Sequence, residues 1–382
     1  MRSPREKRLF RTVRIVCAAV FALFSYTFMS IYQAPLLELA YDMTATGKLQ
    51  YNANITAAVV TIILLIITLW LNKYAKFNRE WEALAYLPAS IFLAFITNID
   101  RGIYTGVSIP ASWIAIAASV ILIYVTAAWV LRRVLFMRIK DITRATNRIL
   151  WRNLLLLSII FSATGFLSKC DENFKHEAMI YHYVKRGDFA KACKVGQRSL
   201  NASQELTAGR AFLLAHEGLL GEKLFTYPQY YGAEGLLPKR NCASPLSSQM
   251  VYELVDIEPQ TGEAAMDYIA RAAATDSAAT CAKDYYLCAM LLDRRLEAFA
   301  DTVAGYYDTT NAATLPMHYK EALLLSSKLN GNDAPFNDPD LEKRYNEFRL
   351  LEKEYEEPLA RTNYTRKQFG TTYWWYYLYA GK

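Results

Sequence analysis

Long apolar runs in the first half of the chain limit what it can fold into more than any other feature. Three of them approach or exceed the roughly 17 to 25 residues that a helix needs to cross about 30 Å of hydrocarbon, namely Ile15–Tyr32, Ile55–Leu71 and Ala111–Leu131. Continuous apolar segments of this length are typical of helices surrounded by lipid. The first half is therefore predicted to lie in a membrane.

Two further runs, Trp81–Thr97 and Ile149–Leu167, are apolar but carry a charged side chain near one end, Glu82 and Arg152 respectively. A charged side chain close to a helix end can extend to the membrane surface, which lowers the cost of inserting it. With these two runs the sequence predicts a five-helix transmembrane domain over residues 1–168.

Basic residues alternate from one side of the predicted spans to the other. They are dense before the first span, between the second and third, and between the fourth and fifth, whereas the Gln33–Asn54 loop has only Lys48 and the Asn98–Pro110 loop only Arg101. Basic loops stay in the cytoplasm. The amino terminus is therefore predicted to be cytoplasmic, and residues 169–382 form an extracytoplasmic domain, which in a bacterial inner membrane is periplasmic.

The positive charge follows this division of the chain. Up to Ser168 there are 18 Lys and Arg against 7 Asp and Glu, and the remaining residues hold 25 and 29 of the totals of 43 and 36. Juxtamembrane cations interact with anionic lipid at about 1 kcal/mol each. The basic half thus indicates the lipid bilayer as a partner and gives no reason to expect nucleic acid.

The second half shows apolar residues at spacings of three and four throughout, which predicts helices. The expected helices are Glu172–Lys185, Asp188–Leu200, Gln204–Leu219, Ser248–Val255, Thr261–Ala274, Ala279–Leu292, Arg294–Tyr306, Met317–Lys328 and Asp338–Glu356. Asp338 is suited to cap the last of them and Pro358 to end it. The predicted fold class is all-α.

One helix pair resembles a tetratricopeptide repeat. In "YHYVKRGDFAKACKVGQRSL" the residues Gly187, Asp188 and Phe189 stand at the turn, and Ala192 stands where the helices would touch. Glycine permits the sharp turn and aspartate can start the second helix. The resemblance implies an α-solenoid of tetratricopeptide type in residues 169–382.

The whole chain also resembles an uncharacterised bacterial membrane family that joins several spans to a tetratricopeptide-like domain. Three phrases carry the resemblance: "GEKLFTYPQ" at Gly221–Gln229, "LPMHYKEALLL" at Leu315–Leu325 and "TYWWYYLY" at Thr372–Tyr379. It implies architecture and bacterial origin, and it brings no activity.

Patterns of catalysis and cofactor binding are missing from the sequence. The four histidines form no HExxH pair for zinc, and there is no phosphate-binding or dinucleotide-binding glycine motif and no G-x-S-x-G elbow. We therefore predict no catalytic, metal or cofactor-binding residues and no cofactor. Enzyme activity is left open as the less favoured alternative.

Aromatic residues are the candidate interaction surface, namely Phe225, Tyr227, Tyr230, Tyr231, Trp374 and Trp375. Rigid amphipathic rings are frequent anchors in binding sites. Two alternatives stay open for the loop: its rings fill the interior, or they bind a peptide, protein or glycan. The tail either caps the helical domain or lies at the membrane interface.

These features together predict a membrane-anchored scaffold that presents a tetratricopeptide-like domain to protein partners. The alternatives are a membrane enzyme or accessory subunit acting on envelope lipid or glycan, and a transporter component. The central parts of the predicted spans hold no Asp, Glu, Lys, Arg or His, which disfavours transport.

Overall fold

The computed structural model describes residues 4–44, 50–75, 79–105, 142–197, 199–239, 244–246, 248–255, 257–260, 262–275 and 280–380, with residues 115, 118, 119, 122 and 126. Over these residues the chain consists of helices joined by turns, and they include no β-strand. The all-α prediction is confirmed. The chain divides into two compact units, Met1–Ala178 and Met179–Lys382.

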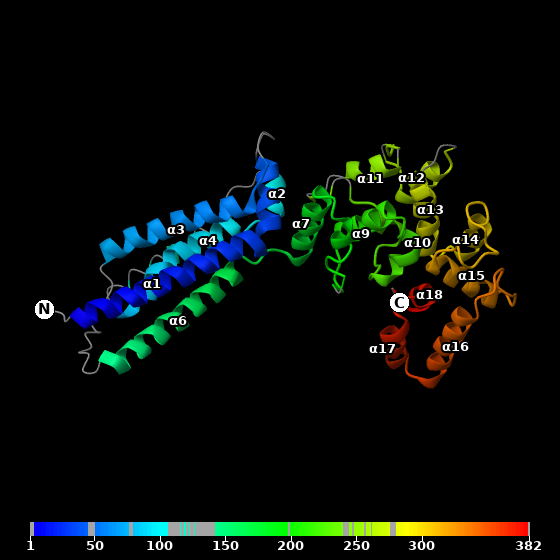
Figure 1. The fold of residues 1–382 in the computed structure, drawn as a ribbon. Helices are drawn as coiled ribbons and strands as arrows, with labels where there is room; N and C mark the ends of the chain where they lie inside the picture. Colours follow the sequence, from blue (N-terminus) through cyan, green and yellow to red (C-terminus); the bar gives the residue numbers. More distant parts are fainter. Residues whose placement is uncertain are drawn as a thin grey trace. The chain divides into compact units, whose positions relative to one another are not determined.

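Helices α1, α3, α4 and α6 lie alongside one another in the first unit (Figure 1). Its elements are α1 (Pro4–Thr27), the π-helix η1 (Phe28–Tyr32), α2 (Ala34–Thr44), α3 (Ala53–Ala75), the 3-10 helix η2 (Arg79–Tyr86), α4 (Leu87–Thr97), the 3-10 helix η3 (Arg101–Thr105) and α6 (Ile142–Leu167). Buried apolar side chains such as Phe21, Tyr86 and Leu93 form its core.

Three of these helical segments are long and apolar enough to cross a membrane: Phe10–Tyr32, Ala53–Asn72 and Asn147–Leu167. They correspond to the first, second and fifth predicted spans, and they have the length and composition of a membrane protein. The predicted fourth span, Ala111–Leu131, lies outside the described residues apart from a few single positions.

The predicted third span, Trp81–Thr97, is not one continuous long helix. The α-helical part, α4, has 11 residues and is about 16 Å long. It is preceded by η2, in which Trp81 leaves the helical region at φ −119° and ψ 40°. Pro88 stands at the first turn of α4, where proline is tolerated because no helical N–H is lost.

The Glu82 side chain points into the first unit and is paired there, whereas the sequence predicts a side chain that extends outward to the membrane surface. Its side chain is 4% exposed, and its carboxylate accepts hydrogen bonds from Arg14 Nε at 2.8 Å and Asn72 Nδ2 at 2.7 Å. A buried carboxylate is tolerated when a cation and further donors pair with it. Glu82 therefore joins α1, η2 and α3 from inside the unit.

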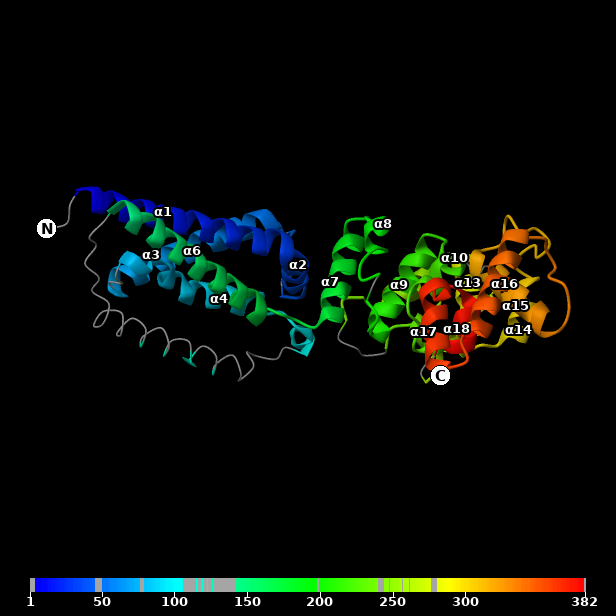
Figure 2. The same cartoon turned by 90° about the horizontal axis from the view of Figure 1, so that it is seen from below.

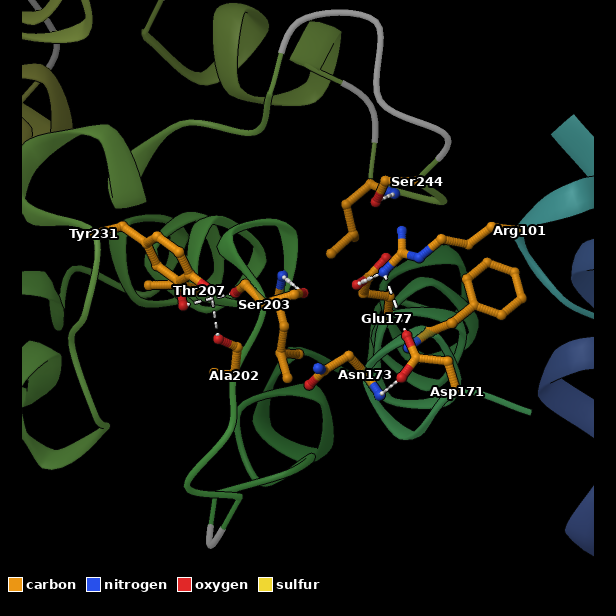
Figure 3. Close-up of polar contacts among 12 residues, drawn as sticks. Arg101, Asp171, Asn173, Glu177, Ala202, Ser203, Thr207, Tyr231 and Ser244 are labelled. Atoms are coloured by element: carbon orange, nitrogen blue, oxygen red, sulfur yellow. Dashed lines mark hydrogen bonds and ion pairs between the residues drawn. The ribbon is translucent and has the colours of Figure 1, made fainter. Parts of the chain in front are cut away.

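The last turn of the first unit is tied to η3 by another ion pair. Arg101 donates from Nη2 to Glu177 Oε1 at 2.6 Å, and the Glu177 side chain is fully buried (Figure 3). The Arg101 guanidinium also lies 5.4 Å from the ring centroid of Phe174. These contacts hold the beginning of α7 (Glu172–Lys185).

The second unit contains the remaining helices, with α7 shared at the boundary (Figure 2). They are α8 (Phe189–Ala192), α9 (Gln204–His216), α10 (Leu220–Lys223), α11 (Ser248–Val255), α12 (Ala265–Ala273), α13 (Thr280–Leu292), α14 (Leu296–Val303), α15 (Met317–Leu329), α16 (Pro339–Glu354), α17 (Pro358–Phe369) and α18 (Tyr373–Tyr379), with 3-10 helices η4 (Leu224–Thr226) and η5 (Gly232–Leu236). Their buried faces share one hydrophobic core.

The predicted repeat is present only in part. Gly187 has a φ of +72° and makes the expected turn, but the helix predicted over Asp188–Leu200 is the single turn α8. Gly196 also has a positive φ, +61°, and this left-handed backbone ends helical structure. One helix followed by one turn does not form the stacked pairs of a solenoid.

The aromatic tail forms α18 and packs into the core of the second unit. Tyr373, Trp374 and Tyr376 are buried, and the Trp374 ring meets Tyr345 edge to face with centroids 5.5 Å apart. The preceding helix α17 begins at Pro358, which was expected only to end α16. The Asp338 cap is confirmed, since its side chain accepts from Leu341 N–H at 3.1 Å.

Candidate functional site

A cavity of about 350 Å³ lies in the second unit between two segments that are more than a hundred residues apart in sequence. One wall comes from the loop after α10, with Phe225, Tyr227, Gln229 and Tyr230. The other comes from α17 and α18, with Arg366, Trp375, Tyr376 and Tyr379. Both walls are largely aromatic, and each includes at least one residue of the predicted interaction surface.

Internal hydrogen bonds hold the loop wall in place. The Tyr227 hydroxyl donates to the Cys193 carbonyl at 2.6 Å, and Gln229 Nε2 donates to the Leu224 carbonyl at 2.9 Å. Phe225 and Tyr227 are buried. Hydrogen bonds to backbone carbonyls thus fix the positions of the Tyr227 and Gln229 side chains in this wall.

A buried histidine–glutamate pair on α15 joins the two walls. The Phe225 N–H donates to His318 Nε2 at 3.3 Å, so His318 Nδ1 carries the proton that is donated to Glu321 Oε2 at 2.9 Å. The same Glu321 oxygen accepts from the Tyr373 N–H at 2.7 Å. His318 and Glu321 are almost fully buried, so this pair acts as a structural joint between the loop and α18.

The three sequence phrases that carried the family resemblance meet at this joint. Glu222 Oε2, from the first phrase, accepts from the Met317 N–H in the second at 2.6 Å. Gly221 faces the ring of Tyr319, where a Cβ would stand 2.6 Å from Cζ. Phe225 packs edge-on against Tyr373 of the third phrase, at 5.1 Å between ring centroids.

Three arginines lie over rings that line the cavity, one for each ring. Arg210 is 5.0 Å from the ring centroid of Tyr227, Arg294 is 5.5 Å from that of Tyr376, and Arg366 is 5.7 Å from that of Trp375. These are cation–π distances. None of the described residues that line the cavity is an aspartate or a glutamate.

Arg210 is the most buried of the three, at 3% exposure. It donates from Nη2 to the Gly196 carbonyl, while its Nε and Nη1 have no partner among the described residues. Burial lowers the pKa of Arg210 to about 10, so the guanidinium stays protonated at neutral pH. The Arg210 guanidinium therefore places a positive charge next to the Tyr227 ring without itself lining the cavity.

Arg294 clamps the end of the tail wall. It donates to the Ala380 carbonyl and, at 3.5 Å, to the Tyr376 carbonyl. Its own φ of +56° lies in the left-handed region, which costs a non-glycine residue about 1–2 kcal/mol. The side-chain contacts with the tail offset this cost.

The predicted surface residues separate into three environments. Phe225, Tyr227, Tyr230 and Trp375 line the cavity. Trp374 is fully buried in the core. Tyr231 lies next to the cavity loop, outside the lining set, and its hydroxyl donates to the Ala202 carbonyl at 3.1 Å beside the Ser203 cap of α9 (Figure 3).

Sequence reasoning missed Arg366, Gln229, Tyr376 and Tyr379 in the walls and the His318–Glu321 joint behind them. The joint has a readable signal, because its two side chains are three residues apart on a helix and so share a face. The arginines have none, since each lies in a different helix or turn and only the tertiary fold brings them to the rings.

A second buried polar cluster lies deeper in the same unit. Asp284 Oδ1 accepts from the hydroxyls of Tyr307 at 2.7 Å and Tyr319 at 2.9 Å. Burial raises the pKa of the Asp284 carboxyl and of the neighbouring Cys288 thiol. A thiol held protonated in this way is a poor nucleophile, and the described residues contain no group of three side chains that could hold a metal.

Comparisons with known proteins place the chain in one family. No curated protein and no protein of solved structure matches it significantly. The model of a family of unknown function, DUF6057, matches residues 3–266 and 260–380. Because the two matches together extend over nearly the whole chain, this protein belongs to the DUF6057 family.

Proposed function

We propose that this protein is a membrane-anchored binding protein of the bacterial envelope, and that the aromatic cavity is its recognition site. The observation that carries the proposal is the cavity itself: its walls are preformed, rich in aromatic rings and fixed by a buried joint. Concave, mostly apolar sites with a few polar groups are typical of ligand binding. The role is that of a scaffold that recruits a partner to the membrane.

The proposed location is the inner membrane, with a cytoplasmic amino terminus and the second unit in the periplasm. The long apolar helices support a membrane location, and the alternating basic loops support the orientation. Five crossings require that η2 and α4 cross together. At about 2.0 Å per 3-10 residue and 1.5 Å per α residue, their 8 and 11 residues reach at most about 32 Å, because Trp81 interrupts the helical path.

We further propose that α7 and α8 are a degenerate tetratricopeptide-like repeat. The turn glycine Gly187 and the buried Ala192 support this relationship. The rest of the helical unit then represents a solenoid whose later repeats have been reshaped around the cavity.

A photo-crosslinking side chain at Tyr230 tests the binding function in intact cells. Tyr230 lines the cavity and is 53% exposed, and Tyr364 is a matched control that is 50% exposed but is not among the lining residues. An adduct that forms at position 230 and not at position 364 is expected. Equal labelling at the two positions, or none at either, contradicts the proposal.

Orientation is tested separately with a compartment-sensitive reporter fused after Lys382 through a flexible linker. Activity of a reporter that works only outside the cytoplasm is expected. A cytoplasmic signal would show an even number of crossings and would remove the envelope role.

A further inference from the structure

The cavity carries positive charge that its own residues do not neutralise. Arg366 lines it, and no carboxylate of the described chain lies within ion-pair distance of this guanidinium. The lining rings Tyr227 and Tyr376 are backed by Arg210 and Arg294. Glu352 accepts from the Tyr379 hydroxyl but is itself paired with Arg349 at 2.5 Å. A concave site with this charge attracts an anion.

The hydroxyl or N–H groups of three wall rings already donate hydrogen bonds within the protein. Those of Tyr227, Tyr376 and Trp375 donate to Cys193, Leu292 and Thr365 respectively. These rings therefore offer mainly their apolar surfaces to an occupant, and such surfaces favour a flat apolar face.

A small set of polar groups around the rings stays available. Gln229 uses Nε2 internally, whereas its Oε1 accepts no hydrogen bond from the described residues. Gln197, Tyr230 and Thr371 line the cavity and are exposed. These groups both donate and accept, so they suit a ligand with several hydroxyls.

We propose that the cavity binds an acidic sugar, a pyranose ring that bears a carboxylate. The inference rests on the proposed binding function and names its ligand class. Arg366 pairs with the carboxylate, the C–H face of the sugar ring packs on Trp375 and Tyr376, and the sugar hydroxyls bond Gln229 Oε1 and the polar rim. The Arg366 guanidinium lies 5.7 Å from the ring centroid of Trp375, and a cation–π contact of this kind leaves its N–H donors available to a carboxylate.

A sugar fits these features better than a peptide does. The volume of about 350 Å³ is at the small end of ligand sites, which span about 300–1,000 Å³. It accommodates one or two rings more readily than an extended chain. A peptide also needs partners for its own backbone N–H and C=O groups, and the free groups here are side-chain amides and hydroxyls suited to a polyhydroxylated ligand.

The test measures binding of defined sugars to the full-length protein in lipid nanodiscs by calorimetry. The probes are glucuronic acid, a glucuronic acid tetramer and neutral glucose. We expect glucose to bind at least tenfold more weakly than glucuronic acid, and higher salt to weaken the binding of both acidic probes. Tighter binding of the tetramer than of the monomer identifies a glycan chain as the source, and equal binding identifies a free sugar.

Arg366→Gln and Lys367→Gln form a matched pair of variants. They remove the same charge from adjacent exposed residues, of which only Arg366 lines the cavity. Because hydrogen bonds between charged groups contribute most, Arg366→Gln is expected to weaken glucuronic acid binding roughly ten- to hundredfold. Lys367→Gln should change it less than twofold. Equal effects of the two variants would overturn the proposal.

A peptide with a free carboxyl terminus is a further probe, and its binding distinguishes failure of the proposed ligand class from failure of the proposed binding function. If the peptide binds and both acidic sugar probes fail, the ligand class is wrong and the binding function stands. If none of these probes binds and the crosslinker at Tyr230 forms no adduct in cells, both are wrong.

Discussion

Replacing Trp374 by alanine should lower the free energy of unfolding of the second unit, because this side chain of the tail is buried in the core of that unit. Trp374 is fully buried and lies against Tyr345 and Phe348. Removing a buried Trp or Phe side chain costs about 3–5 kcal/mol. The Trp374 indole N–H is buried and has no partner in the described chain. Removing it also removes the free-energy cost of burying an unpaired donor. We therefore expect the lower end, about 3 kcal/mol.

Alkylation of Cys288 measures this change in the full-length protein. The Cys288 side chain is fully buried on α13, so a thiol reagent reaches it only when the unit opens. When reclosing is faster than the reaction, the labelling rate follows the opening equilibrium. A loss of about 3 kcal/mol then accelerates labelling of Cys288 more than 100-fold, since each 1.4 kcal/mol is tenfold.

Trp375→Ala is the control, since it makes the same chemical change one residue away. Trp375 is only partly buried, so its removal should accelerate Cys288 labelling by about tenfold or less while it weakens sugar binding. Similar labelling in wild type and Trp374→Ala would refute the view that the tail completes the core.

Three further changes test other contacts. Burial raises the pKa of Asp284, so the folded state keeps a proton that the unfolded state releases. The free energy of unfolding should therefore fall as pH rises from about 4 through the folded pKa. Urea titrations at several pH values should show this fall in the wild type and not in Asp284→Asn. Gly221→Ala places a Cβ 2.6 Å from the Tyr319 ring and should cost about 1–3 kcal/mol of unfolding free energy, whereas an unchanged urea midpoint would contradict the packing. Arg101→Ala removes a partner of buried Glu177 and should cost about 1–3 kcal/mol locally, seen as faster amide exchange in α7 and not in α15.

Local sequence signals predicted the long helices well. The helix over Glu172–Lys185 matches its prediction at both ends, and Asp338 caps α16 as expected. The failures fall where a tertiary contact decides. Glu82 turns inward because Arg14 and Asn72 meet it there, and no pattern in residues 79–97 indicates those partners.

The sequence predicts which type of residue forms the candidate site, but it does not predict where in the fold the site lies. Aromatic density identified Phe225, Tyr227 and Trp375, but the cavity exists because His318 and Glu321 hold the loop and the tail together. Residue spacing in one segment does not report on a segment more than a hundred residues away. The charge at the cavity has the same origin, since Arg210, Arg294 and Arg366 come from separate elements.

The ion pair between Arg14 and Glu82 has a consequence for how the protein is made. In the proposed arrangement, in which η2 and α4 cross the bilayer together, an unpaired Glu82 is costly to insert. An ionised side chain at a helix centre costs about 2.5–3.5 kcal/mol, and α4 has only 11 residues to compensate for it. Glu82 gains its partners only if α1 and α3 are still beside it during insertion. These segments should therefore leave the translocon as a group, and biogenesis should stall when Arg14 loses its charge.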